Sequence, residues 1–559
     1  MKGTDRRDDD THDGSVTPEA HGGSVTPEDR PATRTTAHAG RGDRKPSIEA
    51  KVGQLFHVGF EGTSPPDELE ALIHDRGVGG VIYFDRNLRT PRQTRSLTRR
   101  LQDLALETEL GLPLFVSVDQ EGGIVRRLPY YTPTPGQMAV GATGTVDAAA
   151  TIASITAEQL RSVGINWNLA PVLDVNSDPE NPVIGVRAYG ERPEAVAEFG
   201  TRYVEALHDA GVLSCGKHVP GHGATTVDSH VGLPVVDADR ERLDRVETVP
   251  FRRAIDAGVD AIMTAHVAFP SITGSGSKPA TLSSDVLDGY LRDRFGFEGL
   301  IVTDCLEMDA IADTVGTPQG AVEAIEAGAD AVLVSHTVET QKRAIDAVLD
   351  AVDRGRIPES RIDEAFERIR SLKTGRDLIP SMEPPNVDRN RNRVRAIADR
   401  AVTLLCDRDD RLPLSADQPI RILALQPSYR SPVEDERSYV EPLSTELRAY
   451  GFDVSTVTVY REQYEEGSIE PPGPLDGQLV CCTTDVSHNP FQRELVESLL
   501  EAETDPIVAA VRTPYDAGRL PGVGTLLTSY DPTRANLEAL ARVLAGEQRP
   551  EGTVPHSLR

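Results

Sequence analysis

Residues 299–304, GLIVTD, form a short apolar run that ends on a carboxylate, and the recurrence of this pattern decides the fold class. Such runs are typical of buried strands in a parallel sheet. Eight of them follow one another, at 55–60, 79–84, 113–119, 165–175, 212–218, 260–267, 299–304 and 329–335. Amphipathic segments lie between them, and those at 65–77, 194–211 and 318–328 each end at a glycine suited to a helix C-terminus.

Eight alternating strand and helix units predict an α/β fold, a TIM-type (β/α)8 barrel over residues 47–378. An eight-stranded doubly wound sheet fits the same pattern and stays open as the alternative. Residues 379–392 are charged and contain proline, and we predict a linker there. Residues 393–559 again alternate apolar runs with helical segments, which predicts a smaller three-layer α/β sandwich domain.

The first 46 residues differ from the rest of the chain. They are polar, and they carry the sequence GSVTPE twice, at 14–19 and 23–28. Because they contain too little apolar surface to offset the entropy of ordering, we predict a disordered, acidic N-terminal tail.

The composition excludes two classes of partner. The 88 acidic and 59 basic residues give a formal net charge of −29, so we expect neither nucleic acid nor an anionic membrane to bind. Seven of the basic residues are lysine. An acid-rich, lysine-poor surface indicates a protein that stays hydrated at high salt, and hence a halophilic host, although an ordinary acidic protein is the alternative.

The five cysteines are too few and too irregularly spaced for a disulfide framework or a metal quartet. The N-terminal residues lack the apolar segment of a secretory signal, and no apolar run approaches the roughly 20 residues that span a bilayer. We therefore expect a cytoplasmic protein without a metal ion or another cofactor.

Polar side chains stand where the predicted barrel strands end. In chain order they are Asp119, Arg126 and Arg127; Asp174 and Arg187; Lys217 and His218; His266; and Asp304. Because the chemistry of (β/α)8 barrels gathers at the carboxyl ends of the strands, we expect one site there. Asp304 has two interpretations, a partly desolvated carboxylate that faces a substrate or an N-cap of the next helix.

The segment KHVPGHGATTVDSH, residues 217–230, predicts a glycine-rich loop that carries an acid/base group. Asp228 lies two residues before His230, close enough to hold one ring nitrogen and raise the basicity of the other. Lys217 suits the binding of a hydroxyl or carboxylate. The alternative is a zinc site, although the spacing of the possible ligands matches no standard pattern: His218, His222, Asp228 and His230.

Four motifs in this order resemble glycoside hydrolase family 3, in its β-N-acetylglucosaminidase branch: DQEGG with the following RR, APVLDVNSDPENPVIGVRAYGE, KHVPGHGATTVDSH and GLIVTDCLEM. The resemblance covers residues 47–559, because AVTLLCDRDDRLPL and AAVRTPYDAGRLPGV resemble the second domain of the family. The chain departs from the branch at Val219, where phenylalanine is common, and at Cys305, where a second aspartate is frequent.

The resemblance implies a role for eight residues. Asp304 would be the nucleophile of a covalent glycosyl-enzyme intermediate, and His230, held by Asp228, the acid/base. The residues that would hold the hydroxyls and N-acetyl group of the terminal sugar are Asp119, Arg127, Arg187, Lys217 and His218.

The implied function is a retaining exo-β-N-acetylglucosaminidase that releases terminal β-linked N-acetylhexosamine from a carbohydrate substrate. A histidine acid is neutral after it gives up its proton and does not repel an incoming anion. A β-N-acetylglucosaminide phosphorylase is therefore one alternative, beside a broad-specificity β-glucosidase of the same family. A catalytically silent sugar-binding protein is the alternative from another class.

Overall fold

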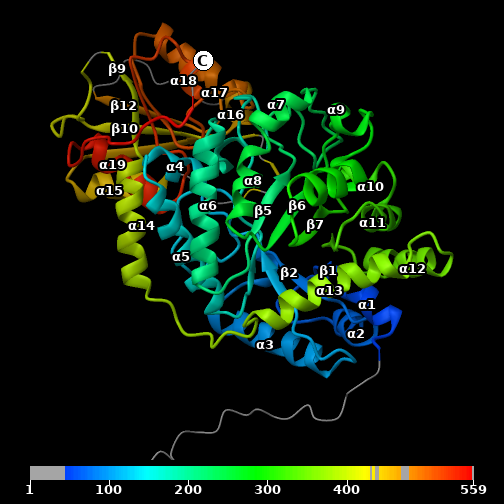
Figure 1. Ribbon diagram of the computed structural model, residues 1–559. Helices are drawn as coiled ribbons and strands as arrows, with labels where there is room; N and C mark the ends of the chain where they lie inside the picture. Colours follow the sequence, from blue (N-terminus) through cyan, green and yellow to red (C-terminus); the bar gives the residue numbers. More distant parts are fainter. Residues whose placement is uncertain are drawn as a thin grey trace, which may run out of the picture. The chain divides into compact units, whose positions relative to one another are not determined.

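The computed structural model describes residues 45–408, 410–428, 431–432, 434, 440–467 and 477–556 (Figure 1). The predicted N-terminal tail lies outside the described residues, except for Lys45 and Pro46. From Pro46 onward the chain forms one compact unit. In the described part of the chain, none of the helices combines the length and hydrophobicity that a membrane span requires.

The predicted barrel is present. Its strands, all paired in parallel, are β1 (Phe56–Val58), β2 (Gly80–Tyr83), β3 (Phe115–Val118), β4 (Trp167–Asn168), β5 (Cys215–Val219), β6 (Ala261–Thr264), β7 (Leu300–Cys305) and β8 (Ala331–Val334). Each strand pairs with the next one in sequence, except that β4 and β5 share no ladder, and β8 pairs with β1. Backbone hydrogen bonds from Asn168 N to Leu213 O and from Lys217 N to Pro171 O, 2.9 and 3.1 Å long, close the ring between β4 and β5.

Helices lie between the strands, as the amphipathic segments predict. They are α1 (Ile48–Gln54), α2 (Asp67–Arg76), α3 (Pro91–Glu107), α4 (Gln137–Ala142), α5 (Val146–Arg161), α6 (Pro193–Asp209), α7 (Arg240–Arg245), α8 (Val249–Asp256), α9 (Pro270–Thr273), α10 (Asp309–Ala312), α11 (Thr317–Glu326), α12 (Val338–Asp353) and α13 (Glu359–Gly375). Shorter or wider turns are η1 (Asp85–Asn87), η2 (Gly185–Arg187), η3 (Ala280–Leu282) and the π-helix η4 (Asp285–Arg294). Helix α2 ends at Gly77, whose φ of 64° is the left-handed conformation that favours glycine.

The fourth strand is shorter than its apolar run suggests. The run covers residues 165–175, but the paired strand β4 has two residues, Trp167 and Asn168. Pro171 has no N–H to donate, so a continuous ladder cannot pass through it. Beyond the proline, pairing resumes as a single bridge between Val172 and Lys217. This bridge holds the first residues of the loop that connects β4 to η2 against β5.

The second sheet is also of the predicted kind. Its strands are β9 (Thr403–Asp407), β10 (Ile420–Leu425), β11 (Val454–Val459), β12 (Gln478–Thr483), β13 (Ile507–Ala510) and β14 (Thr525–Thr528), in the order β11-β10-β12-β13-β14-β9. All neighbours are parallel except β9, which is antiparallel to β14. The helices are α14 (Val387–Ala401), α15 (Glu441–Ala449), α16 (Arg461–Glu465), α17 (Pro490–Glu501), α18 (Asp516–Arg519) and α19 (Arg534–Leu544).

Two cores, one on each face of this sheet, make it a three-layer sandwich. Ile422 of β10 belongs to the core with α14, α15 and α19, whereas its neighbour Leu423 belongs to the core with α17. Successive side chains of a strand point to opposite faces, which accounts for the alternation.

Helix α14 begins inside the segment predicted as a linker. Residues 379–386 lie outside helices and strands, but α14 starts at Val387 and packs against α4 and α5 of the barrel (Figure 1). Val394 and Ile397 belong to the buried face of this helix. The many arginines between them and around them make the apolar periodicity hard to recognise in the sequence. The boundary between two domains at residues 379–392 stays a prediction.

At the amino-terminal end of the barrel, one buried carboxylate binds three arginines from two helices. Asp330, which precedes β8 and has 0% exposure, receives Arg292 of η4 at 2.5 Å and Arg361 and Arg368 of α13 at 2.9 Å each. The N–H of Ile301 donates to the same carboxylate. A charge that leaves water is tolerated when it is paired in this way.

We predict that Asp330→Ala destabilises the protein by about 3 kcal/mol, because it leaves three guanidinium groups without their shared carboxylate. Denaturant unfolding of wild type and variant measures the difference. The matched control is Asp353→Asn at the exposed end of α12, which we expect to cost less than about 0.5 kcal/mol. Equal stability of the Asp330 variant and the control would contradict the prediction.

Candidate active site

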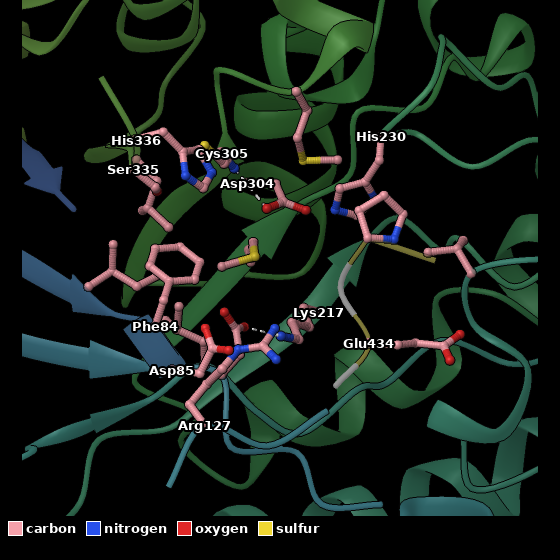
Figure 2. A pocket seen from close by; sticks show the side chains of 18 of the residues that line it. Phe84, Asp85, Arg127, Lys217, His230, Asp304, Cys305, Ser335, His336 and Glu434 are labelled. Atoms are coloured by element: carbon pink, nitrogen blue, oxygen red, sulfur yellow. Dashed lines mark hydrogen bonds and ion pairs between the residues drawn. The ribbon is translucent and has the colours of Figure 1, made fainter. Parts of the chain in front are cut away.

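A cavity of about 640 Å³ lies at the carboxyl ends of the barrel strands (Figure 2). Seven of the eight predicted site residues line it, and the eighth, Asp228, is buried behind His230. Residues that follow β2 and β8, and residues from the connection between β10 and α15, also line it: Phe84, Asp85, Arg86, Ser335, His336, Pro432 and Glu434. The residues predicted from the sequence therefore surround a single cavity.

A chain of paired charges lies at the ends of β3 and β5. Lys217 Nζ lies 2.6 Å from Asp119 Oδ1 and 2.7 Å from Glu121 Oε1. The Arg187 guanidinium donates two hydrogen bonds to the Glu121 carboxylate, 2.8 and 2.9 Å long. Burial acts to raise the pKa of Glu121, but Arg187 and Lys217 outweigh it and hold that pKa well below its usual range. Glu121 is thus an ionised partner between two cations, and it is not among the residues predicted from the sequence.

His218 points into the same cavity as Lys217, although neighbours on a strand usually face opposite sides. The register between β5 and β6 shifts from Gly216 to Val219, and an irregularity of this kind re-aims side chains. His218 Nδ1 lies 2.7 Å from Asp174 Oδ2, a buried carboxylate that also accepts the backbone N–H of His218. Asp174 therefore fixes the ring, which leaves Nε2 as the nitrogen available to the cavity.

His222 anchors the loop that follows β5. Its ring is buried, with Nδ1 2.8 Å from Thr225 Oγ1 and Nε2 3.0 Å from Ser229 Oγ. Burial is the main reason that its pKa is lowered to about 4, and the neighbouring His218 lowers it further. The neutral ring of His222 thus links the start of the loop to Ser229, which lies between Asp228 and His230.

The glycines of this loop allow its backbone to lie against the segment that follows β4, which the sequence does not indicate. A Cβ atom at Gly223 would lie 1.8 Å from Val175 O, so a side chain cannot fit there without moving the backbone. Gly221 has a φ of 142°, in the region that favours glycine. These glycines therefore let the loop pack closely against the segment that follows β4, and do not only make the loop flexible.

The predicted dyad is formed. His230 Nδ1 lies 2.7 Å from Asp228 Oδ1, and the backbone N–H of His230 donates to the same oxygen at 2.9 Å. Asp228 Oδ2 accepts the hydroxyl of Ser431, a residue of the second sheet region, at 2.7 Å. Burial acts to raise the pKa of Asp228, but the hydrogen bonds from His230 and Ser431 hold it well below its usual range. An ionised Asp228 orients the ring of His230 through Nδ1.

Asp304, at the end of β7, is not the N-cap of the next helix. The N-cap of α10 is Met308, and Asp304 Oδ1 instead accepts the N–H of Cys305 at 2.7 Å. Burial acts to raise its pKa, but His218, His266 and His230 outweigh this effect and lower it below the usual value of 3.8. Asp304 is thus an ionised carboxylate on the cavity that also holds His230 (Figure 2).

The rim includes groups from both sheets. Arg86 lies 4.2 Å from the centroid of the Phe84 ring, and the ring of His336 lies 5.3 Å from it. On the other side stands Glu434, which pairs with Arg512. Arg512 also lies 2.9 Å from Asp485, so a network of ion pairs inside the second sheet region ends at the cavity.

The four possible zinc ligands do not converge. His218 faces Asp174, His222 faces two hydroxyls, and His230 faces Asp228. Within the described ranges, no group of three or more histidine, cysteine, aspartate or glutamate side chains has the arrangement of a metal site.

The chain is similar to known proteins of one family. The model described as "Glycosyl hydrolase family 3 N terminal domain" matches residues 47–372. Beta-hexosaminidase A of Pseudoalteromonas piscicida is 37% identical over 333 residues, which make up 56% of this chain and 56% of that protein, so the match spans little more than half of its length. A beta-N-acetylglucosaminidase/beta-glucosidase of Cellulomonas fimi is 27% identical over 549 residues, 91% of this chain and 93% of that protein.

A solved structure is similar over both sheets. It is a glycoside hydrolase family 3 beta-N-acetylglucosaminidase from Paenibacillus sp. str. FPU-7, with a TM-score of 0.86 and 42% identity. The similarity covers 92% of this chain and 99% of that one.

We predict that His222 makes the protein sensitive to acid. Its folded pKa, about 4, is below the 6.5 of an unfolded histidine, so the unfolded state binds the proton more readily. The free energy of unfolding should therefore be unaffected by His222 above about pH 6.5 and fall as the pH drops toward 4. Between pH 7.5 and 4.5, denaturant unfolding should show a loss about 2 kcal/mol larger for wild type than for His222→Gln. A loss of the same size in both proteins would count against a buried, neutral His222.

Proposed function

The chain belongs to glycosyl hydrolase family 3 and is a glycoside hydrolase that acts on carbohydrate; on this premise we propose a retaining exo-β-N-acetylglucosaminidase. In this proposal the enzyme releases terminal β-linked N-acetylhexosamine. The names of the relatives support the choice of sugar, and the His230–Asp228 dyad supports the choice of mechanism.

One observation carries the proposal, the presence of an ionised Asp304 and an oriented His230 on the same cavity. A retaining glycosidase needs a nucleophile that is charged and an acid/base that can first give and then take a proton. The usual arrangement uses two carboxylates. Here His230 would replace the second one.

In the first step, an Asp304 oxygen attacks the anomeric carbon, and we assign Oδ2 because Oδ1 accepts the Cys305 N–H. The bond between the anomeric carbon and the leaving oxygen breaks as His230 Nε2 gives its proton to that oxygen. The imidazolium needed for this step is stabilised by Asp228 through Nδ1. The products are a glycosyl ester on Asp304 and a neutral His230.

In the second step, the neutral His230 Nε2 takes a proton from water as the water oxygen attacks the anomeric carbon. The ester bond to Asp304 breaks, and both groups return to their starting charges. Two displacements at the same carbon retain the configuration of the sugar.

The remaining predicted residues would hold the terminal sugar. Lys217 and Asp119 offer a donor and an acceptor at the ends of β3 and β5, and His218 offers Nε2. Arg127 and Arg187 line the same space, and the pair between Arg187 and Glu121 fixes the guanidinium. A charged acceptor and several charged donors in fixed places suit a ligand that carries many hydroxyls.

Hydrolysis is favoured over phosphorolysis by the charges of the cavity. Lys217 and Arg187 are paired with carboxylates, and Arg86 is paired with Glu61 at 2.9 Å. Glu434 adds a further acidic group to the wall. A phosphate that bound to Lys217, Arg187 or Arg86 would have to replace these pairs, whereas water meets no such barrier.

We also propose that the enzyme works in the cytoplasm of a salt-adapted cell. The support is that all five cysteines are free thiols, four of them buried, and that the net charge is −29.

We predict that Asp304→Ala lowers kcat on an aryl N-acetyl-β-glucosaminide, assayed in molar salt, by about four orders of magnitude. Added azide should restore turnover and give the α-glycosyl azide, because one displacement now replaces two. The matched control is Asp309→Ala, an exposed carboxylate in the first turn of α10, which should leave kcat unchanged. Equal rates for wild type and Asp304→Ala would refute the assignment.

We predict that inorganic phosphate does not change the product. With and without millimolar phosphate, product analysis should show free N-acetylglucosamine and an unchanged rate. The 1-phosphate of the sugar as the main product would establish the phosphorylase alternative in its place.

A further inference from the structure

The acid/base dyad has a partner in the second sheet region. Ser431 lies in the connection between β10 and α15, and it is 203 residues away from Asp228 in the chain. Its hydroxyl donates to Asp228 Oδ2 at 2.7 Å, and both residues are buried, with 3% and 2% exposure. The two oxygens of Asp228 are thus divided, since Oδ1 serves His230 and Oδ2 serves Ser431.

Ser431 is itself held in place. The N–H of Glu434 donates to Ser431 O at 3.0 Å. Glu434 pairs with Arg512, and Arg512 lies 2.9 Å from Asp485 at the end of β12. The position of the serine hydroxyl is therefore set by ion pairs anchored on the second sheet rather than by the barrel.

The loop that carries the dyad has few other supports. Val227 and Val231, on either side of Asp228 and His230, are 43% and 62% exposed, so apolar packing does not hold this part of the loop. From the barrel, His222 fixes Ser229 at 3.0 Å. From the second sheet region, Ser431 fixes Asp228. Contacts from both sheets are needed to define where His230 stands.

We propose that Ser431 is a positioning residue for the acid/base step, so that the second sheet region completes a dyad whose two members both lie in the barrel. This inference rests on the proposed function, since it requires His230 to be the acid/base. Ser431 does not face the sugar; it acts through Asp228.

Removal of the Ser431 hydroxyl should lower kcat/KM for some substrates more than for others. Loss of a hydrogen bond to a buried carboxylate lets Asp228, and with it His230, depart from its place. A poor leaving group depends on the proton that His230 delivers, whereas an activated leaving group departs without it. The ratio of kcat/KM for two such substrates therefore reports on proton delivery, because kcat/KM covers only the steps up to release of the leaving group.

The test compares phenyl and 2,4-dinitrophenyl N-acetyl-β-glucosaminides with the full-length protein in molar salt. For Ser431→Ala we expect kcat/KM to fall about 10-fold on the phenyl substrate and less than about 2-fold on the dinitrophenyl substrate. His230→Ala should show the same selectivity with a larger loss, about 100-fold or more on the phenyl substrate. In the His230→Ala background, Ser431→Ala should have no further effect on either substrate.

Ser428→Ala is the matched control. Ser428 lies in the same connection, and its hydroxyl donates to Asn489 Oδ1 at 3.0 Å within the second sheet region. This variant should match wild type on both substrates.

The outcomes separate the two proposals. An equal loss on both substrates, or a further loss in the double variant, shows that Ser431 is only structural and overturns this inference while the proposed function stands. No selectivity in His230→Ala, or no turnover by wild type, overturns the proposed function and this inference together.

Discussion

Pairing of buried charge is the constraint on which the site depends. Asp119, Glu121, Lys217 and Arg187 meet at the carboxyl ends of the strands, where an unpaired charge would be costly, and each is held by an opposite charge. The consequence is a set of donors and acceptors fixed before any sugar arrives. Fixed polar groups can bind a substrate without having to reorganise.

Much of the fold could be predicted from the sequence, because each barrel strand is a separate apolar run and several of these runs end at a polar residue. The predicted residues Asp304, His230 and Lys217 reached the cavity for the same reason, since a parallel barrel gathers the carboxyl ends of its strands. The pattern failed where backbone hydrogen bonding matters more than hydropathy. At β4, Pro171 ends the ladder that the apolar run suggests.

The residues that were missed share a physical reason. Glu121 lies two residues beyond Asp119, and only the fold brings Arg187 and Lys217 to it. Ser431 is an ordinary serine in the connection between β10 and α15, and its value comes from a contact 203 residues away. A single sequence carries no signal for such pairs. Asp174 stood at a predicted strand end but was given no role, and it proves to hold both His218 and the N–H of His222.

Gly223 has a consequence for attempts to change the specificity of the enzyme. Because a Cβ atom there would collide with Val175 O, the backbone of the loop is pinned at this point. Insertions, deletions or grafts before it would shift His222 and the chain that follows. Room for redesign therefore lies on the far side of the dyad, at Val231 and Val235, which are 62% and 46% exposed and can be replaced by other side chains.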